Sequence, residues 1–229
     1  MKPTNNTILI TGGCTGSGLA IAQKLANRGN KVLITGICKH KLADAVLHNP
    51  NIIPLHFDVS TEEGVNQLAD KVLAEYPQLN IFINNAGQDY RNSQIFEATP
   101  CKERLASGYL AGIYISEMLL PLLQKNRNSA IIDLSPVTIS HTLNQQPLFS
   151  EVVKSIVSYF NMLRYSLRQV ANINIFDAVS LGITELSKQE TIATRVSELF
   201  NQEPFVLAAT GVEAYFHYNN NYSLLAESN

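Results

Sequence analysis

Short runs of β-branched and aliphatic residues alternate with longer amphipathic helical patterns along nearly the whole chain. This alternation is typical of a parallel sheet covered by helices on both faces, which is an α/β, Rossmann-type doubly wound fold. Such a sheet binds ligands at the carboxyl ends of its strands. The expected strands are residues 7–11, 31–35, 51–58, 80–84, 130–135, 172–179 and 212–218.

Local signals place several element boundaries. The first helical pattern covers 17–28 and should end at Gly29, because glycine is the usual C-terminal cap. Pro54 cannot donate to a strand ladder, so the third strand should lie at the edge of the sheet. Ser60 and Glu63 form a capping box that opens a helix reaching about residue 76. Further helices are expected near 40–48, 101–125 and 149–169.

The composition indicates one folded domain over residues 1–229. Hydrophobic residues make up 45% and charged residues 16% of the chain, and we find no repeat or linker. The net charge is −2 and no run of Lys or Arg is present, which argues against nucleic acid or an anionic membrane as a partner. No apolar run approaches the ~18 residues that a membrane span needs, and no signal region begins the chain.

The cysteines and histidines predict neither a disulfide scaffold nor a metal site. Cys14, Cys38 and Cys101 are widely spaced and contain no CxxC pair, which favours a reducing compartment. The five histidines show no HxxxH spacing. We therefore expect a cytoplasmic protein without a bound metal.

A glycine-rich loop, Thr-Gly-Gly-Cys-Thr-Gly-Ser-Gly at 11–18, separates the first expected strand from the first expected helix. Glycines at 12, 16 and 18 permit a tight turn and allow a phosphate to approach the backbone N–H groups at the helix N-terminus. A bare turn is the alternative interpretation. The strand–loop–helix context at the start of a βαβ series favours nucleotide binding.

The spacing Gly-x-x-x-Gly-x-Gly, together with Asp58-Val59 and Asn-Asn-Ala-Gly at 84–87, resembles the short-chain dehydrogenase/reductase family. The similarity extends over nearly the whole chain, through the stretch 158–168 to the Thr184 region. The resemblance implies that the loop holds a dinucleotide pyrophosphate, that Asp58 meets the adenine amine and that Thr184 bonds the nicotinamide amide. The cofactor-binding positions it implies are Gly12, Thr15, Gly16, Ser17, Gly18, Leu19, Asp58, Val59, Asn85, Ala86, Gly87 and Thr184.

The choice between NAD and NADP depends on residues 35–41, Thr-Gly-Ile-Cys-Lys-His-Lys. An acid there would bind the ribose 2′-hydroxyl of NAD, and an arginine would take the 2′-phosphate of NADP. The stretch has neither, and Ile37 stands where NADP-dependent relatives often carry arginine. Lys39 and Lys41 favour NADP by a small margin, although both are equally compatible with solvated positions at the start of a helix.

The catalytic groups that the resemblance implies are replaced in this chain. The family uses a tyrosine proton donor, a lysine four residues later, a serine about thirteen residues earlier and an asparagine on the preceding helix. An ungapped alignment puts Phe149 at the tyrosine, Val153 at the lysine and Pro136 at the serine, and 107–112 contains no asparagine. Phenylalanine cannot donate a proton, and valine can neither tune a pKa nor hold a ribose hydroxyl.

Other residues could supply an acid or base in a relocated site. Ser135 lies one step before the serine position, and Tyr109 and His141 could contribute a phenol and an imidazole. Lys154 lies off the apolar stripe of its helix, as a solvated lysine would. A one-residue slip would instead pair it with Ser150 as a possible dyad. For each of these residues, packing or surface exposure is the simpler explanation.

Two functions are consistent with these sequence features. The favoured one is an NAD(P)-binding protein that has kept the dehydrogenase fold, lost the reaction, and senses the cofactor or binds a partner. The alternative is an active NAD(P)H-dependent oxidoreductase on a small carbonyl or alcohol with non-standard acid–base residues, since hydride transfer belongs to the cofactor. The resemblance also implies a homodimer through the helices at 101–125 and 149–169, where Ile156, Val157, Tyr159 and Phe160 widen the apolar face of the second helix.

Overall fold

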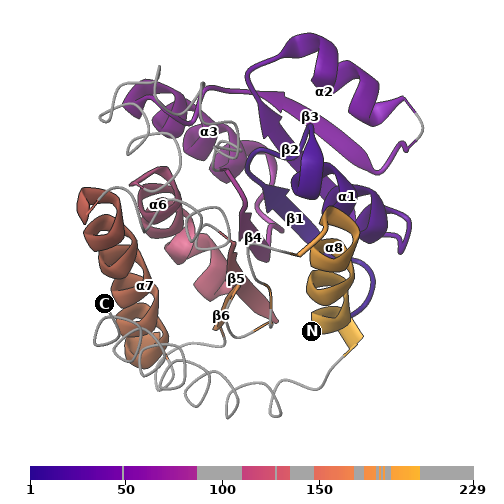
Figure 1. Ribbon diagram of the computed structural model, residues 1–229. Helices are drawn as coiled ribbons and strands as arrows, with labels where there is room; N and C mark the ends of the chain where they lie inside the picture. The colour runs from indigo at the N-terminus through magenta and orange to yellow at the C-terminus, as the bar shows by residue number, and fades with distance from the viewer. Residues whose placement is uncertain are drawn as a thin grey trace.

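A parallel sheet organises the described part of the chain, with strand order β3-β2-β1-β4-β5-β6 (Figure 1). The structure is a computed structural model that describes residues 1–47, 49–86, 110–126, 128–134, 147–167, 173–178, 181, 183 and 187–201, without the side chains of 147–154. The strand predicted at 212–218 lies outside these residues. The strands are β1 Thr7–Ile10, β2 Lys31–Gly36, β3 Ile52–His56, β4 Ile81–Asn84, β5 Ser129–Asp133 and β6 Ile173–Asp177.

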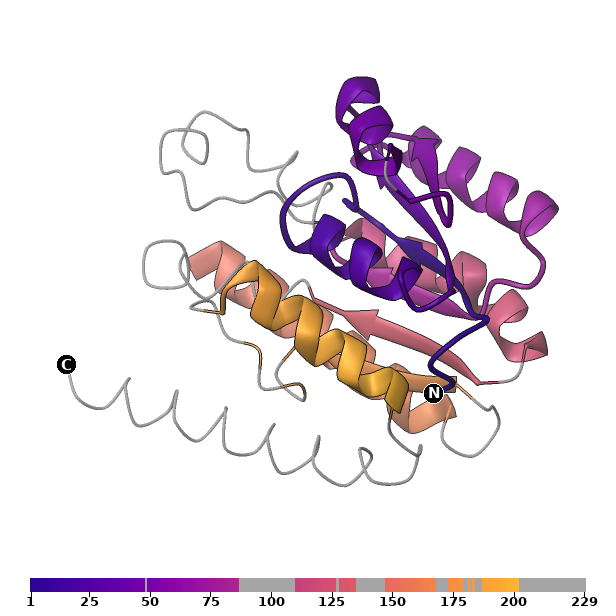
Figure 2. The same cartoon turned by 90° about the vertical axis from the view of Figure 1, so that its right-hand side faces the viewer.

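Helices cover both faces of the sheet, as the alternating sequence pattern predicts (Figure 2). Ile8 and Ile10 of β1 pack into one core cluster, whereas Leu9 between them packs into the other. Because successive side chains of β1 enter the two cores in turn, all four of its residues are buried. The first face carries α1 Gly16–Ala26, α2 Lys39–Val46, α8 Gln189–Glu198 and the short helix η3 Leu199–Asn201; the second carries α3 Glu62–Glu75, α6 Ala111–Lys125 and α7 Pro147–Leu167.

The third strand is confirmed as an edge strand of the described sheet. β3 pairs with β2 alone, with Pro54 opposite Ile34. A proline is tolerated there because its missing N–H faces away from a partner strand.

The capping box predicted for α3 is displaced by one residue. The N-cap is Thr61, whose hydroxyl accepts a hydrogen bond from the N–H of Gly64 at 3.0 Å. The Ser60 hydroxyl instead donates to Asp58 Oδ1 at 2.6 Å. The sequence therefore located the helix start to within a residue but assigned the cap to the wrong hydroxyl.

The two ends of α1 are formed differently. Its C-terminal end lies at Ala26, and Gly29 follows with φ +83°, its N–H donating to Ala26 O at 2.9 Å. This agrees with the predicted stop at Gly29 to within the fraying of a last turn. Its N-terminal end belongs to the glycine loop.

The helix α8 was not anticipated, although its apolar residues Ile192, Ala193 and Val196 repeat at helical spacing. It lies beside α1 in Figures 1 and 2 and is joined to it by an ion pair between Lys24 and Glu190. Arg28 Nη1 also donates to Ser197 O at 2.8 Å. α8 thereby braces the helix that carries the glycine loop.

The helix α7 buries three apolar side chains of the stripe predicted for it. Ile156, Phe160 and Leu167 are buried. Arg164 fixes the helix to β6, because its Nε donates to Ile175 O at 2.9 Å and its Nη2 to Asp177 Oδ2 at 2.7 Å.

The strand order reverses direction between β1 and β4. From β1 the chain proceeds outward through β2 to β3, and it then returns to β4 on the other side of β1. The segments that follow β1 and β4 therefore separate at a topological switch point, where sheets of this kind form ligand crevices. Within the described residues, none of the helices has both the length and the hydrophobicity for a bilayer crossing.

Candidate functional site: the glycine loop

The loop between β1 and α1 has a backbone that only small residues adopt easily. Gly12 and Gly16 have φ values of +65° and +57°, in the left-handed region that favours glycine. A Cβ on Gly18 would lie 2.4 Å from the carbonyl oxygen of Gly12 and 2.5 Å from Asn85 Nδ2. The three glycines singled out from the sequence thus permit two turns and one close approach.

The N-terminus of α1 behind this loop lacks a side-chain cap. Thr15 occupies the N-cap position with an extended backbone, is exposed, and makes no capping hydrogen bond. The first intrahelical bond is from Leu19 N to Thr15 O at 3.1 Å, so the N–H groups of residues 16 to 18 precede the helical ladder. An uncapped N-terminus with glycine at its rim is suited to a phosphate.

Thr11, which is fully buried, connects the loop to the end of β4. Its hydroxyl oxygen accepts hydrogen bonds from the N–H groups of Asn85 and Ala86, at 3.1 and 3.0 Å, and donates to Asn84 Oδ1 at 3.3 Å. The Asn85 side chain continues the connection by donating to the carbonyl oxygens of Thr11 and Gly12, both at 3.2 Å.

Two further contacts fix the loop. Ser17 Oγ donates to Asn85 Oδ1 at 3.0 Å. On the β2 side, Gly12 N donates to Thr35 Oγ1 at 3.2 Å and Gly13 N to Thr35 O at 3.1 Å. Ser17, Asn85 and Ala86, which the family resemblance implies as cofactor-binding positions, lie in the framework that holds the loop. Thr35 was missed in that role, since a threonine at a strand end carries no specific signal.

A buried polar chain extends this framework across three strand ends. Asn84 Nδ2 donates to Asp133 Oδ1 at 2.9 Å, so Thr11, Asn84 and Asp133 link β1, β4 and β5. All three side chains are at most 1% exposed. A Cβ on Gly112 of α6 would lie 2.1 Å from Asn84 Nδ2, so any larger residue at 112 would clash with the Asn84 amide. These hydrogen bonds fix the positions of the carboxyl ends of β1, β4 and β5 relative to one another.

Asp58 lies at the turn that follows β3 and leads into α3. Its Oδ1 accepts from Ser60 N at 2.9 Å as well as from the Ser60 hydroxyl, and its carbonyl oxygen accepts from Thr61. Val59 is partly buried against the second core cluster. Both residues follow the carboxyl end of β3, as predicted. One carboxylate oxygen of Asp58 is already hydrogen-bonded to Ser60.

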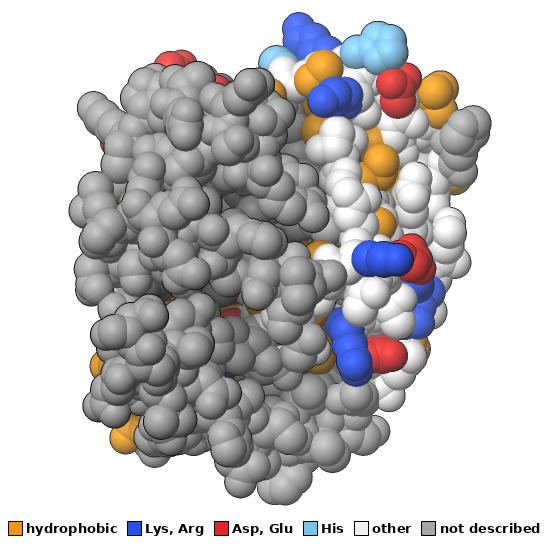
Figure 3. Space-filling view, in the orientation of Figure 1, with side chains coloured by type: hydrophobic (Ala, Val, Ile, Leu, Met, Phe, Trp, Pro, Cys, Tyr) orange, Lys and Arg blue, Asp and Glu red, His pale blue; other side chains and the backbone are white. Residues whose placement is uncertain are grey.

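The segment after β2 presents basic and apolar side chains beside the loop. Ile37 is 67% exposed, and its carbonyl oxygen accepts from His56 Nε2 at 3.0 Å. Lys39 and Lys41 are exposed at the start of α2. Basic and histidine side chains gather over this end of the face seen in Figure 3. The described part of this face otherwise mixes both signs of charge.

Cys14 lies in the glycine loop and faces Gly36 at the end of β2. A Cβ on Gly36 would be 2.6 Å from Cys14 Sγ. Burial raises the pKa of the Cys14 thiol above its ordinary value, while a backbone hydrogen bond and the Lys41 ammonium lower it and Cys38 raises it further. Lys41 and Cys38 are thus electrostatic neighbours of the loop.

Several predicted site residues lie outside the residues that the structure describes. They are Gly87 and Thr184 of the cofactor positions and Tyr109, Ser135, Pro136 and His141 of the catalytic ones. Phe149, Val153 and Lys154 lie within α7, but their side chains are not among those described. In the described ranges, no group of three or more His, Cys, Asp or Glu is arranged to hold a metal ion.

Comparison with known proteins identifies relatives of this arrangement. The family model for short chain dehydrogenases matches residues 6–184. The uncharacterized oxidoreductase DltE of Bacillus subtilis is 32% identical over 175 residues, which cover 75% of this chain and 69% of DltE. The 11-beta-hydroxysteroid dehydrogenase 1A of Arabidopsis thaliana is 25% identical over 73% of this chain, which matches 50% of the plant protein's length.

Solved structures of low identity share the fold. A metagenomic short-chain oxidoreductase in complex with NADP superimposes with a TM-score of 0.71 at 19% identity, covering 88% of this chain and 93% of that one. L-sorbose reductase from Gluconobacter frateurii, complexed with NADPH and L-sorbose, gives 0.65 at 23% identity over 76% of this chain and 68% of the reductase. From the extent of the family match and the identity with DltE, the chain belongs to the short-chain dehydrogenase family.

Proposed function

We propose that this protein binds NAD or NADP at the glycine loop and does not perform the carbonyl reduction of its family. The observation that carries the binding proposal is the uncapped N-terminus of α1, behind a glycine loop that is hydrogen-bonded to both β2 and β4. Two structural neighbours were solved with NADP or NADPH, which supports a dinucleotide as the ligand.

NADP is the preferred dinucleotide in this proposal. The segment after β2 contains no acid that would repel a 2′-phosphate, and Lys41 is close enough to the loop to influence the Cys14 thiol. A lysine there acts as a point charge rather than as a bidentate fork, so the preference over NAD is modest.

The binding proposal can be tested at Gly16 with a matched control at Gly29. Both glycines have left-handed φ, and Gly29 has no heavy atom within 4 Å of an added Cβ. Changing either one to valine should therefore cost a similar ~1–2 kcal/mol of backbone strain. Only Gly16→Val places a side chain at the rim of the phosphate site, beside Gln189 Nε2 at 3.6 Å from the added Cβ.

We expect calorimetry to detect NADPH binding in the native protein and in Gly29→Val, and to detect none in Gly16→Val. Urea unfolding checks that the two variants lose similar stability. Equal NADPH affinity in both variants would contradict the assignment of the loop as the binding site.

The proposed loss of catalysis rests on the residues that the ungapped alignment puts at the family's catalytic positions. A properly placed general acid contributes typically 10²–10⁴-fold, and neither Phe149 nor Val153 can replace a tyrosine and lysine pair. We expect no NADPH oxidation above background with a panel of aldehydes and ketones. The triple variant Pro136→Ser, Phe149→Tyr, Val153→Lys should gain activity, and each single variant should not, because these groups act as a unit.

An active oxidoreductase with relocated acid–base groups is the second candidate, favoured by the oxidoreductase names of several relatives. If this candidate is correct, the native protein turns over substrate, the activity persists in Phe149→Ala, and it falls when Tyr109, His141 or Lys154 is replaced. Such a result would overturn the loss of catalysis while leaving the cofactor proposal in place.

We also propose that two copies associate through the outer faces of α6 and α7. Exposed apolar side chains occur on or next to these helices, namely Leu110 at the N-cap of α6, Tyr114 on α6, and Met162 and Tyr165 on α7. Of the four residues that the sequence offered for this face, Ile156 and Phe160 are buried against the protein's own sheet. The surface available to a partner is thus formed by other residues of the same two helices.

A further inference from the structure

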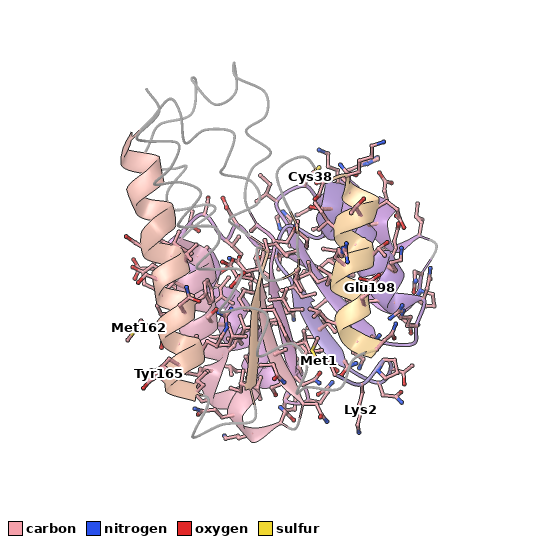
Figure 4. The ribbon with its side chains drawn as sticks, turned by 60° about the horizontal axis from the view of Figure 1, so that its bottom comes forward. Met1, Lys2, Cys38, Met162, Tyr165 and Glu198 are labelled. Carbon is pink, nitrogen blue, oxygen red and sulfur yellow. The ribbon has the colours of Figure 1, made fainter. Side chains whose placement is uncertain are left out.

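Two of the three cysteines of the chain lie on adjoining segments at the expected adenosine end of the dinucleotide site, because Cys14 contacts Gly36, two residues before Cys38. Cys14 is in the glycine loop, and Cys38 is the N-cap of α2, two residues after the end of β2. Figure 4 labels Cys38 at the end of the molecule opposite Met1 and Lys2, where the strands have their carboxyl ends. Both cysteines are free thiols of intermediate burial.

The contact between Cys14 and Gly36 brings the two chain segments together. The Cys14 side chain occupies the place that a side chain on residue 36 would take, with its Cβ 3.3 Å from the position of an added Cβ on Gly36. The backbone of Cys38 is extended, with φ −102° and ψ 107°. The Cys38 thiol and the Lys41 ammonium both influence the Cys14 thiol electrostatically, in agreement with this contact between the two segments.

The segment that carries Cys38 includes an exposed residue, Ile37, directly before the thiol. The Ile37 side chain does not pack into the core, and its carbonyl oxygen accepts a hydrogen bond from the exposed His56 ring. A disulfide requires Cα atoms about 4.4–6.8 Å apart. To form this bond, the Cys14 side chain would turn from Gly36 toward Cys38, with a shift of residues 37 and 38.

We infer that Cys14 and Cys38 form a reversible disulfide site that closes the dinucleotide crevice when the protein is oxidised by a peroxide. This rests on the proposed function, since it takes the glycine loop to be the dinucleotide site. The bond would tie the loop to the β2–α2 turn across the position of the adenosine ribose. A ligand that occupies this position and the disulfide therefore exclude each other.

The chemistry is a two-electron oxidation of the thiol pair by hydrogen peroxide. One thiolate attacks a peroxide oxygen, which gives a sulfenic acid and, after protonation, one water. The second thiolate attacks the sulfenic sulfur, the S–S bond forms, and the sulfenic oxygen leaves as a second water. In sum, two thiols and one hydrogen peroxide give one disulfide and two waters, and a dithiol reductant reverses the change.

The test uses the full-length protein with hydrogen peroxide as the oxidant. Intact mass should fall by two hydrogen atoms, and a non-reducing peptide map should show the peptide of Cys14 joined to that of Cys38. NADPH affinity measured by calorimetry should fall about tenfold or more after oxidation and recover with dithiothreitol. By the same coupling, saturating NADPH should slow formation of the disulfide.

Cys38→Ser is the control for this measurement. In that variant the NADPH dissociation constant should be the same before and after peroxide, and no intramolecular disulfide should form. A disulfide that involves Cys101, a linkage between two chains, or a Cys14–Cys38 disulfide that leaves NADPH affinity unchanged would each overturn the inference. Reduced native protein that binds no dinucleotide would overturn the proposed function and the gating with it, whereas absence of the disulfide overturns this inference alone.

Discussion

At the scale of single residues, the close contact between Gly112 and Asn84 restricts which residues both positions can accept. The Asn84 amide fills the space beside Gly112 and bridges Thr11 and Asp133, so a larger residue at 112 would displace a buried polar group. Forcing extra atoms into a packed interior costs about 1–3 kcal/mol, and loss of buried hydrogen bonds costs a similar amount.

We expect Gly112→Ala to destabilise the protein by about 1–3 kcal/mol in urea unfolding. Asn84→Ala should also destabilise it, but the double variant should lose less than the sum of the two, because the added methyl group then meets no amide. A coupling of about 1 kcal/mol or more would support the contact, since residues that touch interact by about 0.5–3 kcal/mol. Strictly additive losses would contradict it.

Contacts of this kind explain why the glycine loop could be found in the sequence while its supports could not. Gly12, Gly16 and Gly18 stand in a local pattern whose mechanism requires glycine. Thr35, Asp133 and Gly112 meet the loop framework only through tertiary contacts, and nothing in their neighbours along the chain indicates this.

At the scale of elements, the strands followed from the sequence because each is a short run rich in apolar residues, which is buried throughout in β1, β4 and β5 and partly exposed in β2, β3 and β6. The six described strands agree with the predicted ones to within two residues at each end. The N-cap of α3 was predicted less accurately, because Thr61 and not Ser60 caps this helix. Two hydroxyls in adjacent positions can cap the same helix, and only the position of Asp58 decides between them.

The pairing of α6 with α7 includes a hydrogen bond with a predictable pH dependence. Tyr159 Oη donates to Glu117 Oε1 at 2.5 Å. Burial raises the pKa of the Tyr159 phenol well above its usual range, and the nearby Glu117 carboxylate raises it further. A raised folded-state pKa means that the contribution to stability is complete below the unfolded value of about 10 and is lost as the pH rises beyond it.

Tyr159→Phe should therefore destabilise the protein at pH 7, and the difference from the native protein should shrink above about pH 10. The loss at pH 7 should be about 0.5–1.5 kcal/mol, since the pair is partly exposed. Urea unfolding at several pH values measures this. A difference that stays constant into the alkaline range would show that Tyr159 stabilises the protein by packing alone.

At the scale of the whole molecule, the outer faces of α6 and α7 present apolar side chains to solvent. Figure 4 shows Met162 and Tyr165 on the outer side of α7, away from the sheet, and they are 62% and 72% exposed. In the proposed two-fold pairing, the same residues of both copies would be buried in the interface.

Light scattering at micromolar concentration should give twice the chain mass of 25.3 kDa. Replacing Met162 and Tyr165 together by glutamate should shift the protein to monomer, because four charges would face each other across the two-fold axis. Leu73→Glu on α3 is the control, since Leu73 is also an exposed apolar residue but lies on another helix. A native monomer, or dissociation by Leu73→Glu alone, would contradict the proposed surface.

The hydrogen bonds from Thr11, Thr35 and Asn85 have a consequence for the kinetics of recognition. They hold the glycine loop in shape through backbone and side-chain groups that the ligand does not supply. Ordering a flexible loop costs about 1–2 kcal/mol per residue, and here that entropy is already lost when the chain folds. In the proposed binding function, a dinucleotide would therefore meet a loop that is already in place, and ordering residues 11–18 would not slow its capture.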